Sequence, residues 1–478
     1  MRILVAGASG YIGHQLVSRL LAFGHQVRCL YRRPEYGVKV PAGVLACRGD
    51  VLDIESLRTA LCGVECAFYL VHSMAAGGKE FASRDREGAR NFAIAAREAG
   101  VRRVIYLGGL GAGRISAHLE SRQETGRVLR AFGPPLVEFR AGIIVGAGSA
   151  SFEIIRSLAE RLPFMICPRW VTTRVQPIWI EDVLRYLLAA VSAGPQLDGE
   201  IVEIGGASIE SYESMLQEYS RVRGLRRKLL RVPVLTPRLS SYWLDFITDV
   251  PRCITRQLVE GLRSEVICRG KSAREFFPRI VPLAYRESLV QTLSREDPGG
   301  WEEDAESNSF RKDGVISYAV ETKIDSGMTH VRDFVHTLGG GRGWLYANWL
   351  WRLRGFVDRL IGGVGLRRSR LRIIPLRSGD RMDFWRVQEA SESRLLLRAE
   401  MKVPGKAWLQ FLFSPAWNGG TCLRMVASFE PLGLVGELYW WLLYPVHAII
   451  FRGIIKQIKR ELAHHTPAQA STLREHRC

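Results

Sequence analysis

Residues 2–13 read RILVAGASGYIG, a short apolar strand pattern followed at once by Gly7, Gly10 and Gly13. The next residues, YIGHQLVSRLLAFG, have the spacing of an amphipathic helix. Glycines at a strand-to-helix junction permit a tight turn and let backbone N–H groups approach a pyrophosphate. The stretch therefore predicts the first unit of a dinucleotide-binding fold; the alternative is a glycine turn with a purely structural purpose.

Five further strand patterns follow, separated by helical patterns, up to about residue 205: QVRCLY, VLACRG, CAFYLV, RRVIYLG and LVEFRA. Strands that alternate with helices predict a parallel, doubly wound α/β sheet. Residues 206–295 are expected to be a mainly helical extension of this first domain, which we place at 1–295.

A change of composition predicts a second domain. Residues 296–312 carry six carboxylates between Glu296 and Glu306, beside Pro298 and two glycines, and read as an acidic linker. Beyond it, LRAEMKV (397–403) alternates apolar and polar residues, which favours an antiparallel sheet. A long helix is expected over about 434–463. The second domain is thus predicted to be α+β over 313–465, with a tail at 466–478.

The charge and the cysteines restrict the classes of partner. A formal net charge of +19 predicts attraction to anions such as dinucleotides, acidic lipids or acidic metabolites. Nucleic acid is not expected, because no helix-turn-helix signature is visible, and no metal site is expected, because paired metal-ligand spacing is absent. The nine scattered cysteines and an N-terminus without a signal-peptide pattern indicate a cytoplasmic protein.

The end of the second strand distinguishes the two nicotinamide cofactors. A carboxylate there suits a free ribose 2′-hydroxyl, whereas a cation suits a 2′-phosphate. Here the residues are Tyr31, Arg32 and Arg33, which favours NADP(H) over NAD(H) unless the arginines are only a solvated basic turn. After the third strand, the Asp50 carboxylate can accept a hydrogen bond from adenine, whereas Asp53 is expected to cap a helix.

These motifs, with FYLVHSM, GARNFAIAAREAGVRRVIYLGG and QPIWIEDVLRYL, resemble an atypical short-chain dehydrogenase/reductase of the NmrA-like, NAD(P)-binding kind. The remainder is similar to a domain of unknown function that resembles the START/polyketide-cyclase fold. The resemblance also matches Asn91 to a helix asparagine of the superfamily. It implies these cofactor-binding residues: Gly7, Ser9, Gly10, Tyr11, Ile12, Gly13, Arg32, Asp50, Val51, Leu70 and His72.

The catalytic positions depart from that family. Gly108 and Gly109 stand where Ser or Thr is common, and the usual Tyr and Lys positions fall on His118 and Arg122. Residues i and i+4 share a helix face, so both side chains can reach the cofactor, His118 to exchange a proton and Arg122 to bind a ribose or phosphate. The alternative is that His118 is a partly exposed polar residue and Arg122 pairs with Glu120, Glu124 or a phosphate.

Other side chains near this site cannot be ranked from the sequence. Tyr69 and Tyr106 lie within strand patterns and are expected in the core. His72, Ser73 and Ser121 are candidates to face the cofactor.

In the second domain, residues 342–372 hold eight Arg and one Asp among five aromatic residues. The segment fits an anionic lipid or membrane surface, or a helix whose apolar stripe packs while its arginines are solvated; GLRRSRLR, with Arg367, Arg368, Arg370 and Arg372, is its most basic part. The apolar run Leu438–Phe451 is interrupted by Pro445 and His447 and is shorter than the roughly 20 residues that span a bilayer, so it is not expected to cross one. It is expected to roof a cavity for a hydrophobic ligand, or a filled core.

The sequence thus predicts an NADP(H)-binding, reductase-like protein that acts on or shelters a hydrophobic or anionic small molecule held by its second domain. Two alternatives stay open: a non-catalytic, NADP(H)-dependent redox sensor or assembly factor, and a peripheral membrane protein at the inner membrane face. The oligomeric state is not determined by the sequence.

Overall fold

The computed structural model describes residues 1–32, 43–72, 81–111, 116–232, 261, 264–270, 273–294, 309–312, 314–365, 376–416 and 420–464. The chain divides into two compact units, Met1–Glu296 and Asp297–Cys478, and each is described by itself. Arg33, Ser73, the four arginines at 367–372, the tail and most of the acidic linker lie outside the described residues.

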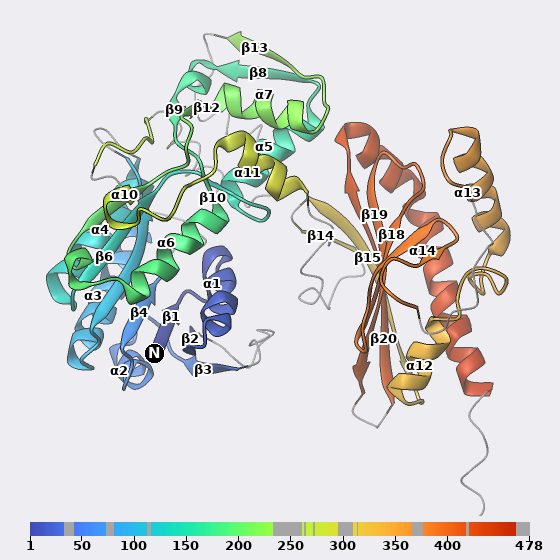
Figure 1. Cartoon of the computed structure of the whole chain (residues 1–478), viewed down its shortest axis with the longest axis horizontal. Helices are drawn as coiled ribbons and strands as arrows, with labels where there is room; N and C mark the ends of the chain where they lie inside the picture. The colour runs from blue at the N-terminus through green and yellow to red at the C-terminus, as the bar shows by residue number, and fades with distance from the viewer. Residues whose placement is uncertain are drawn as a thin grey trace, which may run out of the picture. The chain divides into compact units, whose positions relative to one another are not determined.

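The first unit is built on a parallel sheet, which confirms the predicted α/β class (Figure 1). Its strand order is β11-β6-β5-β4-β1-β2-β3. The winding reverses between β1 and β4, and ligands of such sheets bind in the crevice beyond the carboxyl ends of the strands at that point. The strands are β1 (Arg2–Ala6), β2 (Gln26–Tyr31), β3 (Val44–Arg48), β4 (Cys66–Tyr69), β5 (Arg103–Gly109), β6 (Leu136–Ala141) and β11 (Ile201–Ile204).

Helices cover both faces of this sheet, and each face has its own apolar core. Leu16 and Leu184 belong to the core beneath α1 and α6, whereas Leu57, Phe92 and Leu129 belong to the core beneath α2, α3 and α4. The doubly wound arrangement follows from strands that are buried on both sides. The helices are α1 (Tyr11–Ala22), α2 (Ile54–Leu61), α3 (Phe81–Glu98), α4 (Ala117–Phe132) and α6 (Ile180–Ser192).

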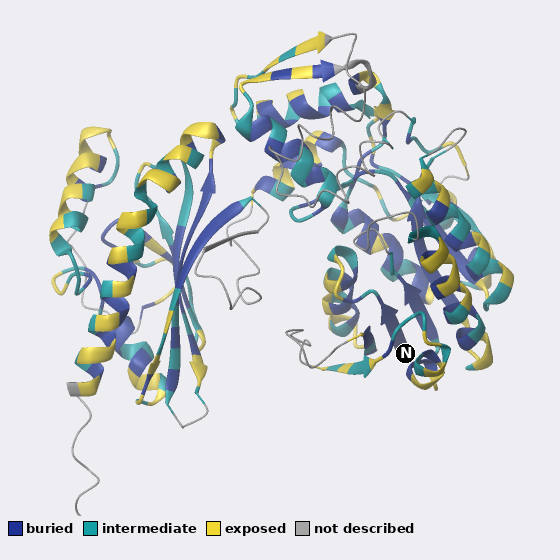
Figure 2. Ribbon diagram, turned by 180° about the vertical axis from the view of Figure 1, so that it is seen from behind, coloured by how far each residue is buried: buried dark blue, intermediate teal, exposed yellow. Residues whose placement is uncertain are grey.

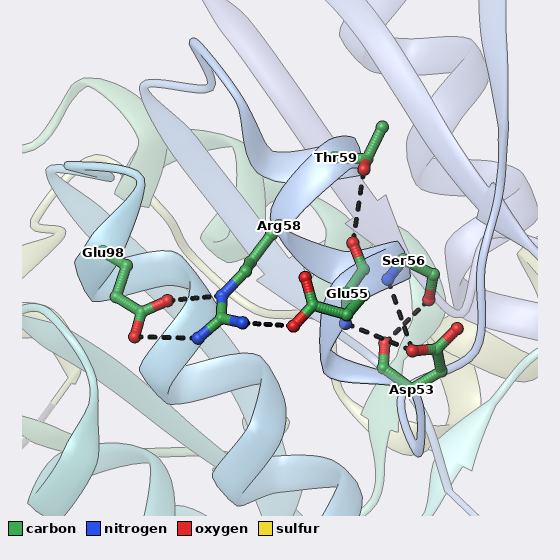
Figure 3. A network of polar contacts seen from close by, with 6 residues as sticks. All are labelled: Asp53, Glu55, Ser56, Arg58, Thr59 and Glu98. Atoms are coloured by element: carbon green, nitrogen blue, oxygen red, sulfur yellow. Dashed lines mark hydrogen bonds and ion pairs between the residues drawn. The ribbon is translucent and has the colours of Figure 1, made fainter.

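Asp53 caps α2, as predicted. Its carboxylate accepts hydrogen bonds from the backbone N–H groups of Glu55, at 3.1 Å, and Ser56, at 3.5 Å (Figure 3). One turn further on, Arg58 donates to Glu98 at the end of α3, with 2.8 Å between Nε and Oε2, and also pairs with Glu55. These bonds fix α2 against α3 and so fix the Asp50–Val51 turn that leads into α2.

The rest of the first unit is less regular. Among the described residues of 206–295, expected to be mainly helical, the structure has three helices and also two strands. β13 pairs in parallel with β8, whereas β12 pairs antiparallel with β9. The remaining elements are β7 (Ile144–Val145), α5 (Ala150–Arg161), β8 (Phe164–Pro168), two 3₁₀ helices (Arg169–Thr172 and Pro195–Leu197), β9 (Arg174–Val175), β10 (Ile178–Trp179), β12 (Glu210–Ser211), α7 (Tyr212–Val222), β13 (Lys228–Val232), α10 (Ala273–Phe276) and α11 (Tyr285–Leu293).

The second unit is α+β, as predicted: an antiparallel sheet in the order β14-β15-β20-β19-β18-β17-β16, with the long helix α14 along it (Figure 1). A core that includes Phe429, Trp440, Phe451 and Ile458 joins α14 to the sheet. The elements are β14 (Ser309–Lys312), β15 (Val315–Ile324), α12 (Met328–Val335), α13 (Asn348–Leu360), β16 (Arg381–Met382), β17 (Trp385–Ala390), β18 (Arg394–Ala399), β19 (Gly405–Pro415), β20 (Thr421–Pro431) and α14 (Gly433–His464).

One expectation for this unit is corrected, and one is confirmed. The strand expected at 397–403 lies at Arg394–Ala399, and its three leucines are all buried instead of alternating. The long helix expected over about 434–463 is α14, which continues through Pro445. The helix packs on the sheet on both sides of the proline, through Trp440 and Ile450, and this packing offsets the lost backbone hydrogen bond.

Within the described part of the chain, one helical segment, Gly433–Ala463 of α14, is long and apolar enough to cross a membrane by length and composition, and 22% of its most apolar window is buried.

Candidate functional site

The glycine loop lies between the end of β1 and the start of α1, and its backbone leaves no room for side chains. Gly7 has a φ of +93°, and a Cβ there would lie 2.7 Å from the carbonyl carbon of Leu70. A Cβ on Gly13 would lie 2.2 Å from the Gly7 oxygen. Gly10, the N-cap of α1, provides no side-chain cap, so the first N–H groups of the helix are left to a ligand. This loop fits a dinucleotide pyrophosphate.

The neighbouring predicted residues lie around this loop. Ser9 is exposed, Ile12 packs against the core of the sheet, and the Tyr11 hydroxyl points at Gly146, where an added Cβ would lie 2.2 Å from it. Leu70 donates its N–H to the Ala6 oxygen at 2.8 Å. The carboxyl ends of β1 and β4 therefore lie next to each other at one edge of the parallel sheet.

The ends of β2 and β3 hold the residues expected at the adenosine half. Tyr31 is buried and Arg32 is exposed. Asp50 Oδ1 accepts from the Leu52 N–H at 3.1 Å, and Asn91 Nδ2 donates to the Val51 oxygen at 3.2 Å. Asn91 thus fixes the Asp50–Val51 turn from α3.

A chain of three polar side chains, one buried and two partly buried, crosses from α3 to α4 at the same edge of the sheet. His72 Nδ1 lies 2.8 Å from Asp85 Oδ2, and His72 Nε2 lies 2.9 Å from His118 Nδ1. Ser121 Oγ also donates to Asp85, at 3.2 Å. Asp85 is only 5% exposed, so these bonds satisfy a carboxylate taken out of water.

The order of donors in this chain follows from the carboxylate. An ionised Asp85 accepts, so His72 carries its proton on Nδ1 and accepts at Nε2. His118 must then donate from Nδ1, which leaves its Nε2 as a lone pair without a hydrogen-bond partner among the described residues. Burial, His72 and Arg122 lower the pKa of His118 to about 3, and burial also lowers that of His72. Both rings are therefore neutral at pH 7, and His118 Nε2 is a proton acceptor.

Arg122 lies beside this chain, and among the described residues its hydrogen bond goes to neither Glu120 nor Glu124, two of the partners considered for it. Its Nη2 donates to the Leu107 carbonyl oxygen in β5, and its guanidinium lies 5.8 Å from the Tyr106 ring centre. Glu124 pairs instead with Arg86, at 2.6 Å. Arg122 is thus fixed at the end of β5, one helical turn after His118.

The last two residues of β5, Gly108 and Gly109, lie close to other side chains. A Cβ on Gly109 would lie 2.7 Å from the tip of the Leu119 side chain of α4, and one on Gly108 would lie 3.1 Å from the Tyr106 ring. A serine or threonine at Gly109 would therefore require the Leu119 side chain to move. Tyr69 and Tyr106 are buried, as predicted for core residues.

Asp85 was not among the residues predicted for the site. A signal was present, because Asp85, Gly88, Ala89 and Phe92 have the i, i+3, i+4, i+7 spacing of a buried helix face. A carboxylate within such a face needs a buried partner, and His72 is that partner.

Comparisons with known proteins agree with the dinucleotide-binding fold of the first unit. Residues 7–134 match a model described as NAD(P)H-binding. The sterol demethylase protein B of Methylococcus capsulatus is 38% identical over 298 residues, which cover 59% of this chain and 85% of that protein. The chain belongs to this family of NAD(P)-binding, short-chain-dehydrogenase-type reductases.

A second relative and a solved structure extend the comparison. A ketoreductase of Stigmatella aurantiaca, named for a farnesyl dihydroquinoline oxide, is 25% identical over 332 residues, or 63% of this chain and 98% of that protein. The triphenylmethane reductase of Citrobacter sp. shares the fold, with a TM-score of 0.50 and 20% identity over 62% of this chain and all of that one.

The second unit of this family member has its own match. Residues 317–454 match a family described as a protein of unknown function, DUF2867. The expected likeness to the START/polyketide-cyclase fold stays a prediction.

Proposed function

We propose that this family member is an NADP(H)-dependent oxidoreductase that interconverts a carbonyl and a hydroxyl group on a hydrophobic small molecule. The Asp85–His72–His118 chain carries the proposal, because it brings a nitrogen able to exchange a proton to the sheet edge where the glycine loop lies.

The cofactor is held by this chain's own backbone and by one cation. The glycine loop and the N-terminus of α1 bind the pyrophosphate. Arg32, exposed directly after β2, binds the 2′-phosphate and favours NADP(H) over NAD(H). When bound, the nicotinamide supplies or takes up the hydride.

His118 is proposed as the catalytic residue that handles the proton. In the oxidising direction its Nε2 accepts the hydroxyl proton while the hydride leaves the same carbon. In the reducing direction that nitrogen first takes up a proton from water and then passes it to the carbonyl oxygen. Asp85 and His72 are positioning residues: they fix the His118 tautomer, and the carboxylate stabilises the positive charge that develops on the two rings.

Arg122 has two proposed effects on this exchange. Its charge contributes to the low pKa of His118, which leaves the Nε2 lone pair unprotonated at pH 7 but makes the ring a weaker base. Guanidinium N–H groups not used on Leu107 can donate to a ribose hydroxyl or a phosphate.

The names of the relatives support a hydrophobic substrate. They refer to a farnesyl dihydroquinoline oxide, a sterol and, for a Caulobacter vibrioides reductase 28% identical over 237 residues, a ceramide. That the second unit holds this molecule stays a prediction. Between α14 and its sheet, Trp440 stacks on Phe429 with 5.7 Å between ring centres, so a ligand there would have to displace packed rings.

The test compares the wild type with His118→Ala and with His330→Ala, an exposed control histidine on α12. A 3-keto sterol, a farnesylated quinolone and a keto-ceramide are offered with NADPH, and the corresponding alcohols with NADP⁺. We expect turnover with one of them, lowered about 10²- to 10⁴-fold by His118→Ala at unchanged NADPH affinity. NADPH binding without turnover on any probe would favour the redox-sensor alternative.

A further inference from the structure

Helix α13 is attached to the second unit by its polar side. The carboxylate of Asp358 is buried and accepts from the backbone N–H groups of Lys402, at 2.7 Å, and Gly365, at 2.8 Å. On the same side, the Trp351 ring stacks on Trp344 with 5.2 Å between ring centres. These contacts determine which face of α13 points outward.

The outward face of α13 is apolar. Trp349, Leu353, Phe356 and Leu360 are all exposed, Leu360 at 70%, and follow one another at spacings of four, three and four residues, which places them on one stripe. A helix on a water-soluble surface ordinarily buries such a stripe and exposes its carboxylates. The apolar stripe that was expected to pack therefore faces outward.

The outward face of α14 changes character along the helix. From Leu434 to Ile449 the exposed side chains are apolar, and Leu442 is 79% exposed. From Arg452 onward the exposed side chains, apart from Ala463, are basic. The exposed residues are, in order, Leu434, Val435, Leu438, Trp441, Leu442, Pro445, Val446, Ile449, Arg452, Lys456, Lys459, Arg460 and Ala463.

No residue of either outward face that is exposed as a whole is acidic; the Glu461 side chain on α14 is 40% exposed, but it is paired with Arg342. On α13 the other exposed side chains are Val357 and the cations Arg352 and Arg359, and the exposed residues of α14 include no acidic one. In Figure 2 both helices show long exposed stretches on the second unit. Apolar and cationic groups without anions match a surface that offers both hydrocarbon and negative charge.

The segment from Lys402 to Pro404 is hydrogen-bonded to α13 and to the residue that precedes α14. Lys402 binds Asp358 of α13, and two residues later the Pro404 oxygen accepts from the Leu432 N–H, at 2.9 Å, just before α14 begins. The apolar face of α13 and the apolar half of α14 are thus fixed to the same part of the unit.

We propose that the second unit docks on the surface of an anionic lipid bilayer through α13 and the outward face of α14. The apolar side chains enter the boundary between headgroups and acyl chains, with tryptophans at that depth, and the basic half of α14 binds lipid phosphates. The apolar run of α14 extends over about 24 Å at ~1.5 Å per residue, and its inner face is committed to the sheet. The helix therefore lies along the surface and does not cross the bilayer.

The test is flotation of the full chain with vesicles of phosphatidylcholine, alone or with about one part in three of phosphatidylglycerol. We expect binding to the mixed vesicles, weaker binding to phosphatidylcholine alone, and weakening as sodium chloride is raised, since salt screens the lysines and arginines. Absence of binding to the mixed vesicles at low salt would overturn the proposal.

Variants separate the apolar contribution to lipid binding from the electrostatic one. Leu438→Glu and Leu442→Glu are each expected to weaken binding tenfold or more. Lys456→Glu and Lys459→Glu should each weaken it about fivefold or more and reduce the dependence on salt. Phe23→Glu, an equally conspicuous apolar residue, 70% exposed on the first unit, is the control and should bind as the wild type does. Equal binding by all five variants would contradict the docking surface.

Two further measurements would show whether the outward face of α14 is covered in some other way than by a lipid surface. Protein that resists extraction by alkaline carbonate would show that α14 crosses the bilayer. A dimer by light scattering that Leu442→Glu converts into monomers, in a protein that ignores vesicles, would show that the face binds a second copy. Either result would overturn docking on a lipid surface.

Discussion

His72 Nε2 and His118 Nδ1 lie 2.9 Å apart, although 46 residues separate the two histidines in the chain. His72 follows β4 and His118 lies in the first turn of α4, so the contact exists only because the parallel sheet brings the ends of β4 and β5 together. Asp85, on α3, accepts a hydrogen bond from His72 and so fixes which nitrogen of each ring carries the proton.

Asp85→Asn should slow turnover without weakening NADPH binding. An amide has no charge to stabilise a protonated histidine pair and can present an N–H to His72, which reverses the tautomers. We expect kcat to fall about 10²- to 10⁴-fold. Ser121→Ala, which removes the hydrogen bond that Ser121 donates to Asp85, is the control, and its kcat should fall by less than about tenfold. A common loss of NADPH affinity in both variants would indicate a structural role instead.

Stability should fall as the solution is acidified. His118 and His447 have pKa values lowered by burial to about 3 and about 4, from an ordinary 6.5. Between these folded-state pKa values and the unfolded-state value of 6.5, the unfolded chain binds more protons than the folded chain. The free energy of unfolding therefore rises with pH across this window, and the contribution of the two histidines is lost as the pH falls below about 6.5. Thermal unfolding at a series of pH values checks this. His447→Phe should flatten the profile of the second unit; an unchanged slope would contradict the assignment.

Gly13→Ala should abolish cofactor binding. Its methyl group would lie 2.2 Å from the Gly7 oxygen, which forces the loop or α1 to move. We expect NADPH affinity to fall by at least about 100-fold, because the backbone N–H groups no longer converge on the pyrophosphate. Gly341→Ala, where an added Cβ meets nothing within 4 Å, is the matched control for fluorescence titration. Normal affinity in Gly13→Ala would show that this loop does not hold the cofactor.

Arg32→Asp should reverse the preference between the two cofactors. A carboxylate at the end of β2 repels a 2′-phosphate and can accept from a 2′-hydroxyl. NADPH affinity is expected to fall about tenfold or more while NADH affinity holds or rises, as measured by titration with each. Equal losses for both cofactors would remove Arg32 from the 2′-phosphate site.

Asp358→Ala should loosen α13. Two backbone N–H groups, of Lys402 and Gly365, would lose their acceptor. Breaking such buried, charge-assisted bonds costs about 3 to 5 kcal/mol, which denaturant unfolding of the second unit measures. Asp333→Ala, at a half-exposed carboxylate paired only with its neighbour Arg332, should change stability by less than about 1 kcal/mol. Similar losses in both would show that Asp358 does not anchor the helix.

Much of the fold could be predicted from local patterns. The six strand patterns from RILVA to LVEFRA became β1 to β6, and the glycines at 7, 10 and 13 lie at the junction where the loop was expected. The C-terminal helix was predicted within one residue at each end. These features follow from hydrophobic periodicity and from glycine's freedom at a tight turn, which act over a few neighbouring residues.

The site itself was only partly predictable. His72 and His118 were separate candidates, and nothing in their spacing joined them to each other or to Asp85. Gly109 was interpreted as a missing hydroxyl, and only the structure shows that it lies against the Leu119 and Arg122 side chains of α4.

The sequence by itself therefore determined the layers, the cofactor loop and the long terminal helix, because each is encoded by the order of apolar residues and glycines. Only the tertiary structure decided that Asp85, His72 and His118 form one hydrogen-bonded chain, and that Asp358 turns the polar side of α13 inward. Both depend on contacts between elements far apart in the chain, where the cost of burying a charge selects the partner and the orientation.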